Sequence, residues 1–257
     1  MSNSKLVKHT KISPNRNINR KYEISRISIH CVVGQCSIET LGNIFASTST
    51  GSSSNYGIGP DGRVGMYCEE KDRSWCTSSY DNDHRAVTIE VASDTKHPYA
   101  VKNKAYEALL DLCEDICRRN NKKKVIWIPN KTEALKYVPA KDEILLTVHQ
   151  WFANKSCPGE YLLSRHEAIA KEVTRRLNPV VEKEPEFKPY KVKVTANALN
   201  IRKGPSTKKT VIGVIRDKGI YTIVKESTGT GAKKWGLLKK GPVEGSSWIS
   251  LDYTKKV

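Results

Sequence analysis

The sequence predicts an α/β domain followed by a small all-β domain. In the first part of the chain, short β-branched runs alternate with longer segments whose apolar residues recur at helical spacing. After residue 189, short β-rich runs are separated by Gly, Pro, Ser and Lys, without helical spacing. Between them, residues 178–189 carry three prolines and alternating charge, which is typical of an extended linker. We therefore predict domains at 1–177 and 190–257.

The first elements of the α/β part follow from local patterns. Residues 26–30 (RISIH) alternate between polar and apolar side chains and predict a strand. Ser37 is a plausible N-cap for a short helix over the following residues. The segment from Asn55 predicts a hairpin with Asp61-Gly62 at its turn. Residues 86–92 (AVTIEVA) predict another strand.

The remaining elements complete the alternation. The segment from Pro98 predicts an amphipathic helix, and residues 123–129 (KKVIWIP) predict a short strand. The segment from Asp142 (DEILLTVHQWF) is interpreted as a helix leading into a strand or loop. Residues 159–177 predict a final amphipathic helix, on which His166 lies among charged residues and is expected on a solvated face.

Charge indicates which partners the chain favours. The formal net charge is +17, from 44 basic and 27 acidic residues. The segment after residue 178 contributes 17 Lys and Arg against 7 Asp and Glu, which gives +10. Such an excess favours polyanions, including nucleic acid and anionic cell-wall polymers. The basic residues do not form a recognised nucleic-acid-binding motif, so we expect no nucleic-acid partner. No sequence pattern predicts an oligomeric state.

Targeting signals and cysteine usage bear on location. The basic N-terminus is not followed by an apolar stretch typical of a secretory signal, so we expect no signal peptide. No apolar run is long enough to predict membrane insertion. The seven cysteines are odd in number and contain no Cys-x2-Cys pair, which favours a reducing compartment over a disulfide framework.

Three residues are candidate ligands for zinc. A catalytic zinc site takes three protein ligands, commonly His nitrogen and Cys sulfur, and keeps one position open. His149 and Cys157 lie eight residues apart in one loop, and His30 ends a predicted strand. Spacing alone leaves other interpretations open, because His30 could be structural and Cys157 a small buried residue. Cys113 and Cys117 are one helical turn apart, which could suit a metal, but Cys113 continues an apolar stripe, so core packing is favoured.

Two charged residues accompany these candidates. Glu90 interrupts an apolar strand, so it needs either a partner or a function, unless the second face of that strand is exposed. Lys155 lies two residues before Cys157 in the same loop. In a chain this rich in lysine, Lys155 could equally be an ordinary surface residue.

Four motifs in order resemble the type-2 N-acetylmuramoyl-L-alanine amidases: RISIH, NYGIGPDGRV, TIEVA and TVHQWFANKSCPG. The resemblance runs from about residue 5 to 177. It implies a central mixed sheet flanked by helices, with zinc in a surface groove. It also implies hydrolysis of the amide that joins N-acetylmuramic acid to L-alanine in bacterial peptidoglycan.

The resemblance assigns a role to each candidate. His30, His149 and Cys157 match the zinc ligands, Glu90 matches a catalytic acid/base, and Lys155 matches the loop cation that stabilises negative charge on the intermediate.

The sequence departs from the pattern at two places. Cys76 follows Trp75 where many members have a Trp-His pair, and Ser54 stands where some members have a catalytic tyrosine. Glu90 would then have to serve as the catalytic residue.

The C-terminal part resembles bacterial SH3 domains. The stretch ALNIRKGPSTKKTVIGVI, residues 198–215, matches the usual opening of that family. Such domains frequently bind cell walls. We therefore expect an SH3-like barrel at 190–257 that binds peptidoglycan and, through its charge, anionic wall polymers.

Other functions stay open at this point. They include a wall-binding protein without catalysis, a host autolysin, a nucleic-acid binder and a cysteine peptidase that uses Cys157. A lytic domain without a signal favours a phage endolysin, which would stay in the host cytoplasm until lysis and then act on the wall.

Overall fold

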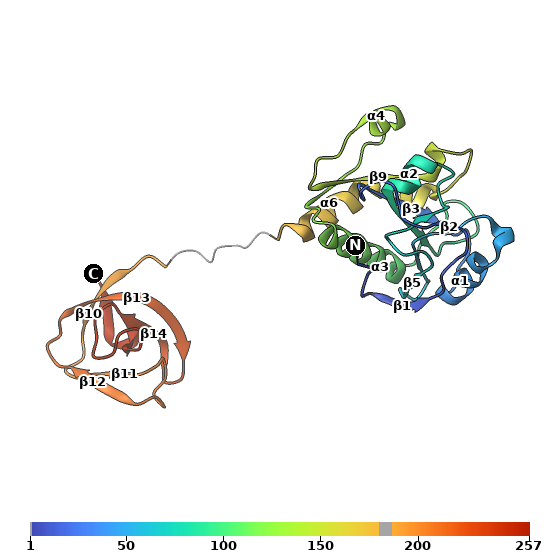
Figure 1. Cartoon of the computed structure of the whole chain (residues 1–257). Coiled ribbons are helices and arrows are strands. Elements are labelled where there is room, and N and C mark those ends of the chain that lie inside the picture. The colour runs from blue at the N-terminus through green and yellow to red at the C-terminus, as the bar shows by residue number, and fades with distance from the viewer. Residues whose placement is uncertain (1, 180–186) are drawn as a thin grey trace. The chain divides into compact units, whose positions relative to one another are not determined.

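The chain was analysed as a computed structural model, which describes residues 2–179 and 187–257 (Figure 1). Two compact units divide at residue 180. Residues 180–186, which form much of the predicted linker, lie outside the described residues, so the linker stays a prediction. Among the helices described, none is both long and apolar enough to cross a lipid bilayer.

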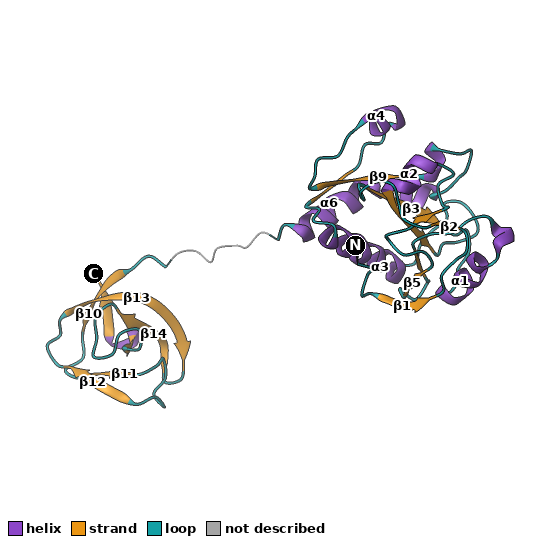
Figure 2. Cartoon of the chain, in the orientation of Figure 1, coloured by secondary structure: helices purple, strands orange, loops and turns teal. Residues whose placement is uncertain are grey.

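The first unit mixes strands and helices (Figure 2). Its strands are β1 (Val7–Thr10), β2 (Arg16–Asn17), β3 (Arg26–Cys31), β4 (Tyr56–Ile58), β5 (Val64–Met66), β6 (Arg73–Ser74), β7 (Ala86–Val91), β8 (Lys124–Ile126) and β9 (Glu143–Thr147). Its helices are α1 (Ile38–Ala46), α2 (Tyr80–Arg85), α3 (Asn103–Arg119), α4 (Lys131–Lys136), α5 (Gly159–Leu163) and α6 (His166–Leu177), with 3-10 turns η1 (Thr48–Thr50) and η2 (His149–Trp151).

Seven strands form one mixed sheet in the order β1-β5-β4-β7-β3-β9-β8. Strand β3 lies near the centre and runs parallel to both β7 and β9, whereas β4 and β5 form the predicted antiparallel hairpin. Helices α3 and α6 pack side by side (Figure 1), and they contact β7 and β8 respectively. The predicted mixed sheet flanked by helices is therefore confirmed.

The alternating polarity of β3 and β7 separates the two faces of the sheet. Ile27, Ile29 and Ile89 belong to the apolar core that includes the buried side of α3. The intervening residues, Ser28, His30, Thr88 and Glu90, must face the opposite side, because successive strand residues alternate. Ser28, His30 and Thr88 are also fully buried. The face of the sheet that points away from α3 therefore carries a row of buried polar side chains.

Helix α1 covers part of this polar face. Gly57 lies in register with Glu90, and a Cβ atom on Gly57 would come within 2.6 Å of Leu41 in α1. A larger residue at this position would therefore have to displace the side chains of Leu41 and Tyr67. The predicted N-cap is confirmed, since the Ser37 side chain accepts a hydrogen bond from the Thr40 N–H.

The segment from Asp142 was wrongly predicted to begin as a helix. It forms β9, which lies between β3 and β8 and runs parallel to both. Ile144, Leu145 and Leu146 are fully buried. A strand covered on both faces reads as a continuous apolar run without alternation, and such a run is easily mistaken for a helix segment.

The final helix was also predicted incorrectly, because it divides into α5 and α6 at Ser164 and Arg165. As the first residue of α6, His166 is fully buried instead of lying on a solvated face. Its Nδ1 atom lies 2.7 Å from the carbonyl oxygen of Leu162. The break between α5 and α6 therefore comes directly before this buried imidazole.

The second unit is all-β, as predicted. It contains β10 (Tyr190–Val194), β11 (Leu199–Arg202), β12 (Val211–Ile215), β13 (Ile220–Gly229), β14 (Ala232–Leu238), β15 (Trp248–Ser250) and β16 (Thr254–Lys256), with one 3-10 turn, η3 (Leu251–Tyr253). These strands form one sheet in the order β12-β11-β15-β14-β13-β10-β16. Their inward side chains make a separate core. The SH3-like identity of this unit stays a prediction.

A buried ion pair ties the β4–β5 region to α3 and gives a stability prediction. Glu70, whose side chain is 1% exposed, accepts hydrogen bonds from Arg119 at 2.6 Å and from the Tyr56 hydroxyl at 2.7 Å. Arg119→Ala would leave this carboxylate buried without its cation, so we expect a loss of roughly 3 kcal/mol in unfolding free energy.

Urea unfolding followed by the circular dichroism of the helices would measure this loss, because α1–α6 all lie in the first unit. Lys171→Ala is the matched control, since it breaks an ion pair with Glu167 that is exposed on α6. Its unfolding midpoint should stay near that of the parent protein. Equal midpoints for both variants would contradict the prediction.

Candidate metal centre

The register of β3 and β7 places His30 beside Glu90 at the carboxyl ends of two parallel strands. His30 is fully buried, and its Nδ1 atom lies 3.8 Å from Glu90 Oε1. The Glu90 side chain is 16% exposed, so it borders solvent while most of it is covered. The two groups are therefore neighbours on the polar face of the sheet.

The loop after β9 brings His149 and Cys157 to the same point. His149 begins the turn η2, and the N–H of Gln150 donates to the carbonyl oxygen of Cys157 at 3.1 Å. This bond closes the loop. Cys157 Sγ lies 3.3 Å from His30 Nδ1, and the rings of His30 and His149 are 5.0 Å apart between centroids.

These three side chains fit a metal ion. One donor atom from each of His30, His149 and Cys157 lies within 4.8 Å of the other two. The Nε2 atom of His30 is buried and has no hydrogen-bond partner among the residues described. Two imidazole nitrogens and one thiolate are a donor set that zinc favours, with one coordination position left open.

A second group of donors shares His30. His30, Cys76 and Glu90 also offer atoms within 4.8 Å of one another. Cys76 Sγ lies 3.9 Å from Glu90 Oε1. The two groups therefore meet at His30, and Cys76 is close to the proposed acid/base.

Burial sets the protonation of the site. It lowers the pKa of His30 to about 3, with His149 adding to the effect. Burial, followed by the charge of Lys155, also lowers the pKa of His149. Both imidazoles are therefore neutral at neutral pH, which is the form that binds metals. Burial raises the pKa of Glu90 to about 7, opposed by its hydrogen bond with Cys76, so Glu90 can exchange a proton near neutrality.

A groove of about 700 Å³ opens over these residues. Glu90, His149 and the exposed Lys155 line it together. Its other walls come from several loops and short strands: Phe45, Thr50, Gly51, Ser52, Ser53, Arg73, Trp75, Cys76, Ser78 and Tyr80. Of the three candidate ligands, His149 lines this groove directly.

Sequence reasoning missed some residues of this site. Ser78 Oγ lies 3.3 Å from His149 Nε2, and Ser78 holds a left-handed backbone conformation with φ of 61°. A partner on the second nitrogen of a ligand histidine fixes its ring. The sequence singles out Cys76 only as a departure from a Trp-His pair, and not as a site residue. Ser78 carries no comparable sequence signal.

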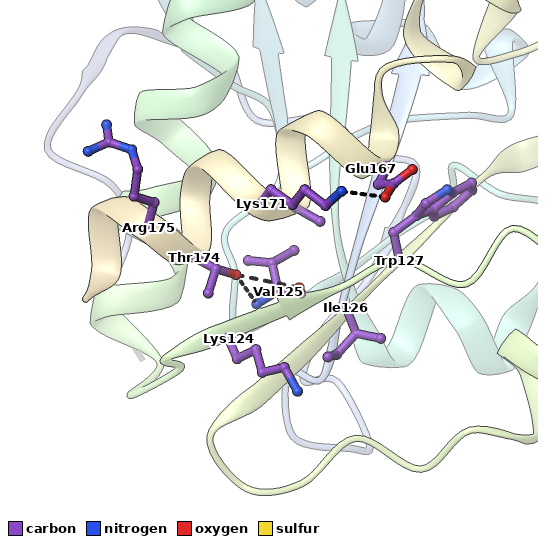
Figure 3. Close-up of a pocket in the computed structure, with 9 residues that line it drawn as sticks. Lys124, Val125, Ile126, Trp127, Glu167, Lys171, Thr174 and Arg175 are labelled. Carbon is purple, nitrogen blue, oxygen red and sulfur yellow. Dashed lines mark hydrogen bonds and ion pairs between the residues drawn. The ribbon is translucent and has the colours of Figure 1, made fainter. Parts of the chain in front are cut away.

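Aromatic packing supports the turn that carries His149. Trp151 stacks on Trp127 at 5.3 Å with an angle of 5° between the planes, and Trp127 lies 4.5 Å from the ring of His166. Trp127 also lines a separate pocket of about 500 Å³ between β8 and α6 (Figure 3). That pocket contains none of the five predicted site residues.

The two cysteines of α3 are part of the core, as expected. Cys113 and Cys117 on α3 are fully buried, and burial raises the pKa of both thiols.

Ser54 is buried as well, and its hydroxyl donates to the carbonyl oxygen of Tyr56.

Comparison with known proteins assigns a family. Residues 6–160, more than half of the chain, match the family described as N-acetylmuramoyl-L-alanine amidase. A comparison with curated proteins gave no match.

Solved structures that match this chain share little sequence with it. The amidase LysC from Clostridium intestinale URNW is 14% identical, with a TM-score of 0.44, and the match covers 63% of this chain and 93% of LysC. The Ph2119 endolysin from a Thermus scotoductus bacteriophage is 17% identical, with a TM-score of 0.42, covering 61% and 90%. A mutant endolysin from Bacillus subtilis is 13% identical, with a TM-score of 0.44, covering 64% and 97%.

At these values the structural likeness does not bear on function, and the assignment rests on the family match. The match spans β3, β7 and the loop with His149 and Cys157. The chain therefore belongs to the N-acetylmuramoyl-L-alanine amidase family, and it is an enzyme that hydrolyses the bond between N-acetylmuramic acid and L-alanine in bacterial peptidoglycan.

Proposed function

We propose that His30, His149 and Cys157 hold a zinc ion in this amidase. The observation that carries the proposal is the convergence of their donor atoms within 4.8 Å of one another, with His149 also lining the groove. When bound there, zinc would polarise the scissile carbonyl and lower the pKa of a water molecule towards about 7.

Glu90 is the proposed general base and acid. It takes a proton from the attacking water and passes it to the leaving amine of L-alanine. Its place beside His30 and its raised pKa support this role. Glu90 is the one carboxylate among the described residues that line the groove. Ser54, which stands in place of a catalytic tyrosine, donates its hydrogen bond to the backbone instead.

Lys155 is the proposed electrostatic stabiliser. It is an exposed residue that lines the groove with Glu90 and His149. A cation at this place would stabilise the negative charge that develops on the carbonyl oxygen of the substrate.

We further propose that the all-β unit holds the enzyme on the cell wall. Its resemblance to bacterial SH3 domains and its excess of Lys and Arg support binding to peptidoglycan and to anionic wall polymers. Attachment through a second unit would raise the effective concentration of substrate at the catalytic unit. A phage endolysin released at lysis is the setting we favour for this combination.

Zinc content tests the ligand assignment. Purified protein should carry about one zinc ion per chain. Cys157→Ala and His149→Ala should each lose most of it, because each removes one ligand of three. Elemental analysis measures the zinc, and mass spectrometry of digested walls identifies the bond cut.

Cys36→Ala and His97→Ala serve as matched controls, because neither residue belongs to the candidate groups. Both should keep zinc and activity. Chelation should stop release of muramic acid with a free lactyl carboxyl group, and added zinc should restore it. Full activity in chelator would reject the metal.

Glu90→Gln tests the acid/base role. We expect kcat on a soluble muropeptide to fall by roughly 10²–10⁴-fold, because the amide cannot accept the proton. Zinc content should be unchanged, since Glu90 is not among the three proposed ligands. Glu167→Gln, an exposed carboxylate on α6, is the control. Near-normal hydrolysis by Glu90→Gln would remove this residue from the mechanism.

Removal of residues 181–257 tests the wall-binding role. We expect binding to isolated cell walls to weaken far more than kcat/KM on a soluble muropeptide, because the groove lies entirely in the first unit. Sedimentation with walls measures the first quantity, and a chromatographic assay measures the second. Equal losses in both would argue against a separate anchoring unit.

A further inference from the structure

Cys76 is a thiol in the groove that the amidase chemistry above does not use. It is partly buried, and it lines the groove together with Glu90. It also stands where the sequence departs from the Trp-His pair of many amidases. This position therefore offers a soft sulfur donor in place of an imidazole nitrogen, and both are donors for divalent metals such as zinc.

The backbone of Cys76 is held in place by a buried carboxylate. Its N–H donates to Asp83 Oδ2 at 3.2 Å, and Asp83 is itself fully buried. The side chain of Cys76 then reaches Glu90, with Sγ lying 3.9 Å from Glu90 Oε1. Donor groups that are already held close to each other lose little further entropy when an ion binds them.

The distances around Glu90 fit a metal ion. Glu90 Oε1 lies 3.8 Å from His30 Nδ1 and 3.9 Å from Cys76 Sγ, and these three residues each offer a donor atom within 4.8 Å of the other two. Ligands of a tetrahedral zinc ion are separated by roughly 3.3–3.8 Å, so small side-chain shifts suffice. The second carboxylate oxygen, Oε2, is buried and has no hydrogen-bond partner among the residues described.

This group of donors shares only His30 with the proposed catalytic centre. The catalytic centre has three ligands of its own, His30, His149 and Cys157, so it should fill first. A second ion would then depend on the Cys76 thiolate and the Glu90 carboxylate, and it should bind more weakly. Hydrolases commonly hold two ions roughly 3.5–4 Å apart, and the negative charges of these two ligands would offset the repulsion between the ions.

We propose that Cys76 and Glu90 bind a second divalent, thiophilic ion, such as zinc in excess, and that this ion inhibits the amidase. The inference rests on the proposed catalytic role of Glu90. A carboxylate that coordinates a metal is no longer free to take a proton from water, so a second ion would stop turnover while the first stays in place. The Cys76 thiol would lose its proton on binding the ion.

Equilibrium dialysis of the full chain against rising free zinc, followed by elemental analysis, tests the second position. The parent protein should bind one ion tightly and a second ion more weakly. Cys76→Ser should keep the first ion and weaken the second by at least about tenfold, because loss of even an outer partner of a metal costs roughly 10–100-fold in affinity. Glu90→Gln should do the same, and it decides the question if Cys76→Ser does not fold.

Hydrolysis of a soluble muropeptide gives a second readout. Excess zinc should inhibit the parent enzyme, and the inhibitory concentration should rise by at least about tenfold in Cys76→Ser. At one zinc ion per chain this variant should be as active as the parent, because Cys76 is not among the three proposed catalytic ligands.

Two further variants make the result specific. Cys76→His keeps a metal donor at this position, so it should retain both the second ion and the inhibition. Cys36→Ala is the matched control, because Cys36 is also partly buried but belongs to neither group of donors. It should bind both ions as the parent does.

Two results would overturn the inference while leaving the proposed catalytic centre intact: a single bound ion in the parent protein at every zinc concentration, or a second ion that binds with unchanged affinity in both Cys76→Ser and Glu90→Gln. A parent protein that binds no zinc would instead overturn the proposed catalytic centre and this inference with it.

Discussion

The parallel, in-register pairing of β3 with β7 is the constraint on which the rest of the site depends. It sets His30 beside Glu90 on one face and sends Ile29 and Ile89 into the core on the other. A shift of one residue would exchange the two faces and bury the wrong side chains. The apolar core on the α3 side therefore also fixes the geometry of the polar side, and the stability of the fold and the arrangement of the site have a common origin.

The polar face needs its own support, because buried polar groups without partners are costly. The side chain of Asn82 donates to Ser28 and to Thr77, and Thr77 in turn binds Asp83. This network connects the floor of the sheet to the loop that carries Cys76 and Ser78. These hydrogen bonds start at Ser28 on the strand that carries His30. They therefore hold the loop that forms part of the groove wall.

Much of the first unit could be predicted from sequence, because β3 and β7 alternate clearly and the motifs around His30, Glu90 and Cys157 are local. Strand β9 could not, since a strand covered on both faces loses its period. The inward turn of His166 depends on a break between α5 and α6 that no proline or glycine marks. Arg73 and Asn17 meet through two-residue strands, which are too short to leave a periodic pattern.

The ligands of the proposed centre lie on two kinds of structural element. His30 belongs to a central strand, whereas His149 and Cys157 belong to a loop closed by the Gln150 backbone bond. Glu90 is held by the strand side alone. Because the Gln150 backbone bond closes the loop and Glu90 is fixed by its strand, loss of the proposed ion would leave both the loop and the proposed acid/base in place. If the proposed centre is correct, the metal-free protein is a folded precursor that would gain its function by taking up one ion.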